Sequence, residues 1–135
     1  MTNILKRQTR EESKLLKKNH LFLKSKKLID SIFENGKYFK EYPLSVRFLQ
    51  VNEVNDINFV ISVKKKYFPK AVDRNKIKRL MRNSLRECVE ELKNKISEQK
   101  KSYHIAIIYN SSIIYDIDYL KDKINLILTR LIVNE

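Results

Sequence analysis

The sequence predicts an α+β sandwich, in which helices pack on a small, mainly antiparallel β-sheet. Three observations lead to this fold class: a long helical period covers residues 74–98, apolar strand patterns lie on both sides of it, and shorter helical patterns lie near each end. The predicted order is helix, two or three strands, long helix, strand, helix. With 135 residues the chain can bury a core as one domain, expected at residues 15–135 after a flexible basic arm at residues 1–14.

A short helix is expected first, because apolar residues recur at helical spacing: Leu28, Ile29, Ile32 and Phe33. Ser25 is the expected N-cap, since a serine hydroxyl can accept a hydrogen bond from a free N–H of the first turn. Gly36, the single glycine of the chain, is expected to end this helix in the left-handed conformation.

Strands are predicted before and after the long helix. In the first one, Leu44, Val46 and Phe48 face inward and alternate with Ser45, Arg47 and Leu49. A hairpin-like loop at residues 53–56 would join it to an apolar strand at Ile57–Val63. A basic loop at residues 64–70 follows, and a further apolar strand is predicted at Tyr103–Tyr109.

The long helix has Asp73 as its expected N-cap and presents two different sides. Its apolar side consists of residues at three- and four-residue steps: Ile77, Leu80, Met81, Leu85, Cys88, Val89, Leu92 and Ile96. Arg79, Arg82 and Arg86 lie on the opposite side, within about 60° of one another. One side is therefore expected to pack and the other to reach outward.

A final helix is predicted near the end of the sequence, capped by Asp116 or Asp118. Its inward side chains would be Leu120, Ile124, Ile127, Leu128 and Leu131. With this set of elements we expect the helices to lie on one face of the sheet.

Positive charge is the main functional signal. The formal net charge is +13, and the excess lies in two blocks: residues 1–27 hold nine basic and two acidic residues, and residues 62–86 hold ten basic residues and one acid. Such a charge predicts attraction to nucleic acid or an anionic membrane. Its restriction to two blocks favours a localised phosphate-binding surface. No apolar run reaches the roughly 18 residues of a membrane span, so no membrane partner is expected.

Residues that usually carry catalysis are scarce. The chain has two histidines, one cysteine and one glycine, without a zinc-binding spacing or a glycine-rich nucleotide loop. Cys88 and His104 lie in apolar patterns and are interpreted as core residues. Asp116, Asp118 and Asp122 could imitate a magnesium cluster, but a helix cap with solvated acids explains them more simply. We therefore expect no catalytic residue and no nucleotide cofactor, and a single cysteine suits the cytoplasm.

The segment from Arg74 to Arg86 contains no acid, whereas an ordinary solvated helix mixes both signs. Solvation alone is the simpler alternative. Phosphate binding explains the missing acids, because the planar fork of arginine can hold a phosphate through two hydrogen bonds. The helix offers cations rather than side chains that read base edges, which favours structured RNA over DNA.

Residues 71–82 read AVDRNKIKRLMR and resemble the signature of the protein subunit of bacterial ribonuclease P. Ser62-Val63 followed by Lys65 and Lys66 resembles the strand and Lys-Lys pair of that family. Ile32-Phe33 with Gly36 resembles its first helix, and Pro43-Leu44 its first strand. The resemblance covers about residues 14–132.

Some positions depart from that pattern. Lys76 stands where the family usually has arginine, Pro69-Lys70 stands in place of Gly-Asn, and Asn83 stands where an acid is common. Ile29 and Arg47 match positions at which many members present aromatic side chains to the substrate, so stacking could shift to Phe33.

The resemblance implies a subunit of a ribonucleoprotein endonuclease that removes the 5′ leader of precursor tRNA. An RNA subunit would carry the active site and most of the Mg²⁺. The implied contacts to this RNA are Lys64, Lys65, Lys66, Arg74, Asn75, Lys76, Lys78, Arg79, Arg82 and Arg86, and the implied leader contacts are Ile29, Phe33, Ser45 and Arg47. A left-handed β-α-β crossover is also implied, although crossovers are generally right-handed. The alternatives are a ribosomal or other structured-RNA-binding protein without a processing role, and a self-contained nuclease.

Overall fold

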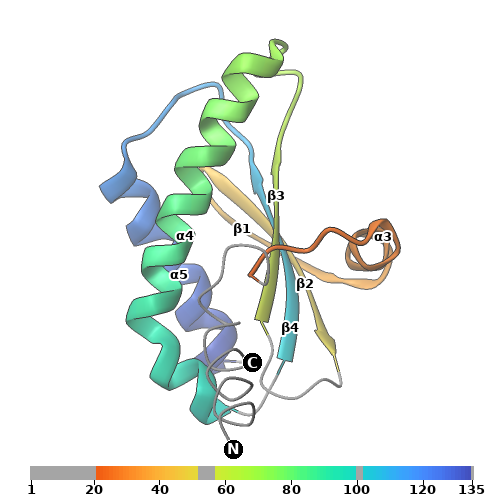
Figure 1. The fold of residues 1–135 in the computed structure, drawn as a ribbon, viewed down its shortest axis with the longest axis vertical. Coiled ribbons are helices and arrows are strands. Elements are labelled where there is room, and N and C mark those ends of the chain that lie inside the picture. Colours follow the sequence, from red (N-terminus) through yellow and green to blue (C-terminus); the bar gives the residue numbers. More distant parts are fainter. Residues whose placement is uncertain (1–20, 52–56, 100–101, 135) are drawn as a thin grey trace, which may run out of the picture.

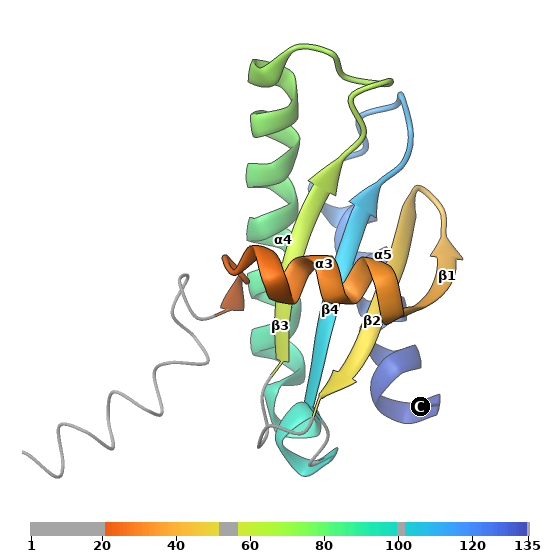
Figure 2. The same cartoon turned by 90° about the vertical axis from the view of Figure 1, so that its right-hand side faces the viewer.

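The computed structural model describes residues 21–51, 57–99 and 102–134, so the predicted arm at residues 1–14 lies outside the described residues. A four-stranded sheet forms the middle layer, with α4 (Ala71–Gln99) and α5 (Ile117–Asn134) on one face (Figure 1). The helix α3 (Lys26–Asn35) crosses the other face (Figure 2). The predicted α+β class is confirmed.

The strands are β1 (Lys37–Glu41), β2 (Leu44–Val51), β3 (Ile57–Val63) and β4 (Ser102–Tyr109). In the sheet they lie in the order β1-β2-β4-β3. Along the chain, the order of helices and strands agrees with the prediction if the optional third strand is β1. None of the described helices is long and apolar enough to cross a membrane.

The two strands that flank residues 52–56 do not form a hairpin. β4 lies between them, antiparallel to β2 and parallel to β3. The predicted hairpin-like connection is therefore wrong as a pairing, and residues 53–56 themselves lie outside the described residues. β4 is apolar and buried along its whole length, which suits an inner strand that is covered on both faces.

β3, α4 and β4 form a crossover between parallel strands. Seen from the α3 side, β3 and β4 point the same way, β4 lies to the right of β3 and α4 lies behind the sheet (Figure 2). This arrangement is left-handed, as the family resemblance implied and against the general preference.

The expectation that the helices share one face is wrong, because α3 packs on the face opposite α4 and α5 (Figure 2). The apolar side of a short helix can cover either face of a sheet, so its periodicity does not decide the side. Ile32 of α3 is fully buried, and α3 contacts β2 and β4. This cover also buries Ser45, which was expected to face away from the core.

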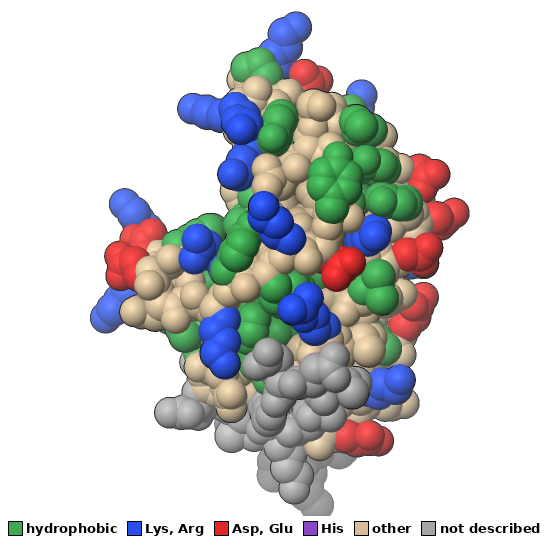
Figure 3. Space-filling model, turned by 180° about the vertical axis from the view of Figure 1, so that it is seen from behind, with side chains coloured by type: hydrophobic (Ala, Val, Ile, Leu, Met, Phe, Trp, Pro, Cys, Tyr) green, Lys and Arg blue, Asp and Glu red, His purple; other side chains and the backbone are tan. Residues whose placement is uncertain are grey.

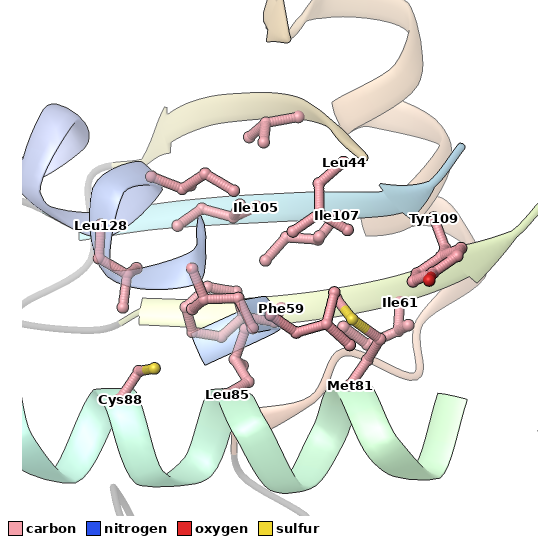
Figure 4. Packing of buried hydrophobic residues seen from close by; sticks show 14 of the residues in the cluster. Leu44, Phe59, Ile61, Met81, Leu85, Cys88, Ile105, Ile107, Tyr109 and Leu128 are labelled. Carbon is pink, nitrogen blue, oxygen red and sulfur yellow. The ribbon is translucent and has the colours of Figure 1, made fainter. Parts of the chain in front are cut away.

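The main core fills the space between α4, α5 and the sheet (Figure 4). Its members on the two helices are Ile77, Met81, Leu85, Cys88, Val89, Leu120, Ile124, Ile127, Leu128 and Leu131. The predicted apolar side of α5 is thus confirmed in full. On α4, Leu80 and Leu92 are only partly buried, and the side chain of Ile96 lies outside the described residues. Each large side chain that is fully buried contributes about 1.5–3 kcal/mol.

The N-caps agree with the predictions in two of three cases. The Leu28 N–H donates to Ser25 Oγ at 3.4 Å, and the Tyr119 N–H donates to Asp116 Oδ1 at 2.9 Å, so both are N-caps. Asp73 is not one: α4 begins at Ala71, and Asp73 lies inside the first turn, where an acid favours the helix dipole.

Gly36 follows α3, but not in the predicted left-handed conformation. Its φ of −75° and ψ of 154° are extended. A Cβ at this position would collide with the Ile32 carbonyl and lie 3.0 Å from the Phe48 carbonyl oxygen. Glycine is required here because the backbone passes close to other backbone atoms.

Candidate nucleic-acid interface

The predicted RNA contacts lie on the first half of α4 and on the loop before it. We call this set the cationic surface: Lys64, Lys65, Lys66, Arg74, Asn75, Lys76, Lys78, Arg79, Arg82 and Arg86. Arg74, Lys78, Arg82 and Arg86 are partly buried, and the others are exposed. Within the described ranges, no lysine or arginine of this set forms an ion pair. Such cations are available to an external anion.

The loop that carries the three lysines is anchored where it leads into α4. Phe68 is buried with its ring edge-on to Tyr109, at a centroid distance of 6.2 Å. Arg74 Nη1 donates to the carbonyl oxygens of Phe68 at 3.0 Å and Pro69 at 2.7 Å. The first arginine of the signature therefore holds the loop against the start of α4. These contacts define the backbone path at Pro69-Lys70, where the sequence departs from the family.

Apart from Asp73 in the first turn, the acids of α4 lie farther along the helix, and two of them form ion pairs with α5. Lys121 Nζ of α5 lies 2.9 Å from Glu87 Oε2 and 3.7 Å from Glu91 Oε1. The hydrogen bond to Glu87 raises the pKa of Lys121. On the face that Figure 3 shows, several Asp and Glu side chains lie along one edge, and others are scattered among the Lys and Arg. Among the described residues, therefore, no acid forms an ion pair with the lysines and arginines in the first half of α4.

A cleft of about 350 Å³ lies between α3 and the sheet. Its lining residues are Phe33, Tyr38, Ser45, Arg47, Ser62, Lys64, Ile108 and Asn110. Three of the four predicted leader contacts, Phe33, Ser45 and Arg47, come together here. The fourth, Ile29, is partly buried one turn earlier on α3 and is not among the lining residues. Lys64 belongs to both the cleft and the cationic surface, so the two are continuous.

The cleft combines a cation, aromatic faces and hydrogen-bonding groups. The Arg47 guanidinium lies 5.2 Å from the centroid of the Tyr38 ring. Ser45 Oγ accepts from Asn110 Nδ2 at 3.2 Å and from the Tyr38 hydroxyl at 3.5 Å. Phe33 and Tyr38 keep 37% and 47% of their surface exposed, which leaves ring surface for a ligand. Stacking surfaces beside a cation suit a single-stranded nucleic acid.

The predicted leader contacts did not include Tyr38 and Asn110, which also line the cleft. Tyr38 lies opposite Arg47 in the β1–β2 register, so the signal would have been a strand pairing that the charged segment Lys37–Glu41 does not reveal. Asn110 enters the cleft because β4 pairs with β2 far away in the sequence.

Cys88 and His104 are buried, as predicted, at 0% and 3% exposure. Burial is the main cause that raises the pKa of the Cys88 thiol to about 12, and the charge of Glu91 is the second, so the thiol stays neutral. In the described part of the chain, no three His, Cys, Asp or Glu side chains are grouped so that they could hold a metal ion.

These features define a class: a small basic α+β protein with a cationic surface that continues into a cleft. The chain matches the family model described as Ribonuclease P over residues 15–131, and it belongs to that family.

A ribonuclease P protein component of Porphyromonas gingivalis, strain W83, is 35% identical over 91 residues. The match covers 66% of this chain and 64% of that relative, so it spans less than two thirds of the relative's length. Among solved structures, the RNase P protein from Thermotoga maritima is 25% identical with a TM-score of 0.62, over 80% of this chain and 94% of that one. An RNase P protein mutant from Staphylococcus aureus is 20% identical with a TM-score of 0.60, over 87% and 92%, which shows likeness of fold.

Proposed function

We propose that this chain is the protein subunit of a ribonuclease P. It would bind the catalytic RNA and the 5′ leader of precursor tRNA, and so promote endonucleolytic removal of the leader to give mature tRNA 5′ ends. The observation that carries the proposal is the cationic surface, whose lysines and arginines form no ion pair within the described residues. It occurs in a chain of the ribonuclease P family.

The cationic surface is assigned to the catalytic RNA. Each lysine or arginine that meets a phosphate releases condensed counterions, which gives affinity without reading sequence. Arg79, Arg82 and Arg86 extend from one side of α4 and offer planar forks for phosphate oxygens. Lys76 keeps the charge of the family's arginine but offers only a point charge. Asn75, exposed at the start of the helix, adds a neutral donor and acceptor.

The cleft is assigned to the leader of precursor tRNA. Phe33 and Tyr38 of its lining supply ring faces on which unpaired bases stack, which suits a single strand rather than a duplex. Arg47 would meet a leader phosphate while Ser45 and Asn110 bond to sugar or base. Ile29 would extend the apolar side of this contact along α3. Because Lys64 is shared, leader and catalytic RNA would meet at the mouth of the cleft.

Catalysis is assigned to the RNA subunit. Mg²⁺ would supply the activated water of the hydrolysis when bound. The described residues offer no group of three His, Cys, Asp or Glu for it, and a cationic surface repels metal cations, so Mg²⁺ would be held mainly by the RNA. The part of the protein is then to bind and orient two RNAs, and we propose that it does so in the cytoplasm.

The test is reconstitution of precursor-tRNA cleavage with the protein alone, with ribonuclease P RNA alone, and with both. At low Mg²⁺ the two together should cleave the leader much faster than the RNA alone. RNA binding without any gain in cleavage would instead support a ribosomal or other structured-RNA-binding protein. Cleavage by protein free of RNA would support a self-contained nuclease.

A further inference from the structure

Two arginines of the cationic surface lie over one phenylalanine ring from the start of the described chain. The guanidinium carbons of Arg82 and Arg86 are 5.9 Å and 5.4 Å from the centroid of the Phe22 ring. Both distances are within the range in which a guanidinium is attracted to an aromatic face. Phe22 lies far from α4 in the sequence, so helical periodicity does not reveal this contact.

Phe22 is held in place by the sheet rather than by the arginines. It forms an isolated parallel bridge with Phe59 of β3, and the Leu23 N–H donates to the Phe59 carbonyl oxygen at 2.7 Å. Leu21, the preceding residue, is buried in the core at 4% exposure, and Phe22 itself packs partly buried against that core. The ring is therefore a fixed surface beside α4.

Without an anion, the two arginines destabilise the protein by their mutual repulsion and by the partial burial of their charges. They are four residues apart on one side of α4, where like charges repel. Burial, and then the charge of Arg82, lowers the pKa of Arg86. Arg86 donates through Nη1 to Asn83 Oδ1 at 2.9 Å, while its Nε is buried without a hydrogen-bond partner in the described part of the chain. No acid among the described residues forms an ion pair with either arginine.

We propose that Phe22 is a positioning residue, which holds Arg82 and Arg86 side by side as a site for a phosphodiester of the RNA backbone. This inference rests on the proposed function. The ring offsets part of the repulsion between the two cations and removes rotamer freedom before the RNA arrives, so less entropy is lost on binding. Phe22 makes no contact with the RNA in this proposal, and its effect acts through the two guanidinium groups.

The test is a mutant cycle on the affinity for ribonuclease P RNA, measured by fluorescence anisotropy over a range of salt. Phe22→Leu keeps an apolar side chain but removes the ring face, and should weaken binding about threefold to tenfold. The salt slope should stay unchanged, because no charge is lost. Phe22→Tyr keeps the face and should restore the affinity. In an Arg82→Ala/Arg86→Ala background, Phe22→Leu should have no further effect.

A merely structural role would give a different result, since loosening of the segment at residues 21–23 would weaken binding equally in both backgrounds. That outcome, or an unchanged affinity for Phe22→Leu, overturns the inference. If Phe22→Leu lowers the melting temperature, Phe22→Met replaces it in the same cycle. Phe39→Leu is the matched control, because the Arg130 guanidinium lies 4.2 Å from the centroid of the Phe39 ring, on another part of the molecule. This substitution should leave RNA affinity unchanged.

The proposed function is tested separately by the same measurements. If the protein with all native residues does not bind the RNA, the proposed function fails. If it binds and the loss of Arg82 and Arg86 weakens binding, while Phe22→Leu has no effect, only the inference about Phe22 fails.

Discussion

The two halves of α4 share one apolar side but treat their charges in opposite ways. From Arg74 to Arg86, the cations are exposed or partly buried and form no ion pair within the described residues. After Arg86, Glu87 and Glu91 both form ion pairs with Lys121 of α5. The difference indicates that one helix can have two roles: two acids of the second half pair with α5, whereas the cations of the first half have no ion pair among the described residues and are assigned to RNA in our proposal.

The comparison predicts that the inner side of the basic half contributes to stability and the outer side to binding. Leu85→Ala removes a fully buried side chain between α4 and the sheet. We expect the free energy of unfolding to fall by about 2–5 kcal/mol, which chemical denaturation would measure. Folded Leu85→Ala should still bind RNA with the native salt slope. A reduced slope would mean that the two sides of the helix are not separate.

The outer side is tested by Arg79→Ala combined with Arg82→Ala. RNA affinity should fall about ten- to a hundredfold, and the salt dependence should flatten by about one or two units of slope. Lys121→Ala combined with Lys123→Ala removes the same charge from α5 and is the matched control, for which the slope should hardly change. An unchanged slope in the arginine variant would remove those residues from the phosphate contacts.

The acidic half can be tested through Cys88, the first buried residue after the cationic surface. Its pKa is raised to about 12 in the folded protein, whereas an unfolded cysteine ionises near pH 8.5. Above that pH the unfolded state loses the proton and the folded state keeps it, so this contribution to stability declines as pH rises from about 8.5 toward 12. Denaturation at several pH values should show a steeper decline for the native protein than for Cys88→Ala. Equal declines, or thiol labelling at pH 8 as fast as that of a free cysteine, would contradict the raised pKa of Cys88 in the folded protein.

The smallest effect is expected at the ion pairs of the acidic half. Lys121→Met removes the contacts to Glu87 and Glu91, which are about half exposed. Exposed ion pairs contribute little and are screened by salt. Calorimetry should show a small decrease in melting temperature at low ionic strength that disappears at high ionic strength, with RNA affinity unchanged. A large loss at high salt would mean that Lys121 packs rather than pairs.

Local patterns in the sequence were sufficient for the helices. The spacing that predicted α4 and α5 also identified the residues that face the core, because helical burial repeats every three to four residues. The position of β1 was not predicted, because Lys37–Glu41 is an edge strand whose side chains are exposed or only partly buried. The charge pattern located the cationic surface in the same way, since its members are neighbours on one helix and one loop.

Long-range contacts could not be predicted from spacing. The pairing of β2 with β4, the face chosen by α3 and the position of Phe22 beside α4 all join distant segments. Tyr38, Asn110 and Phe22 are therefore the residues that the structure places beside the predicted contacts of the two proposed RNA sites. The left-handed crossover came from family resemblance, since general statistics favour the other hand.

The central position of β4 has a consequence for how this protein is made. β2 and β3 leave the ribosome well before β4, yet each forms its main pairing with that later strand. Until residues 102–109 emerge, an almost complete cationic surface is attached to two strands with unpaired edges, which are prone to wrong pairing. Because these contacts are distant in sequence, the closing step should be slow relative to helix formation. RNA present at the site of synthesis would then meet the basic helix before the sheet behind it is complete.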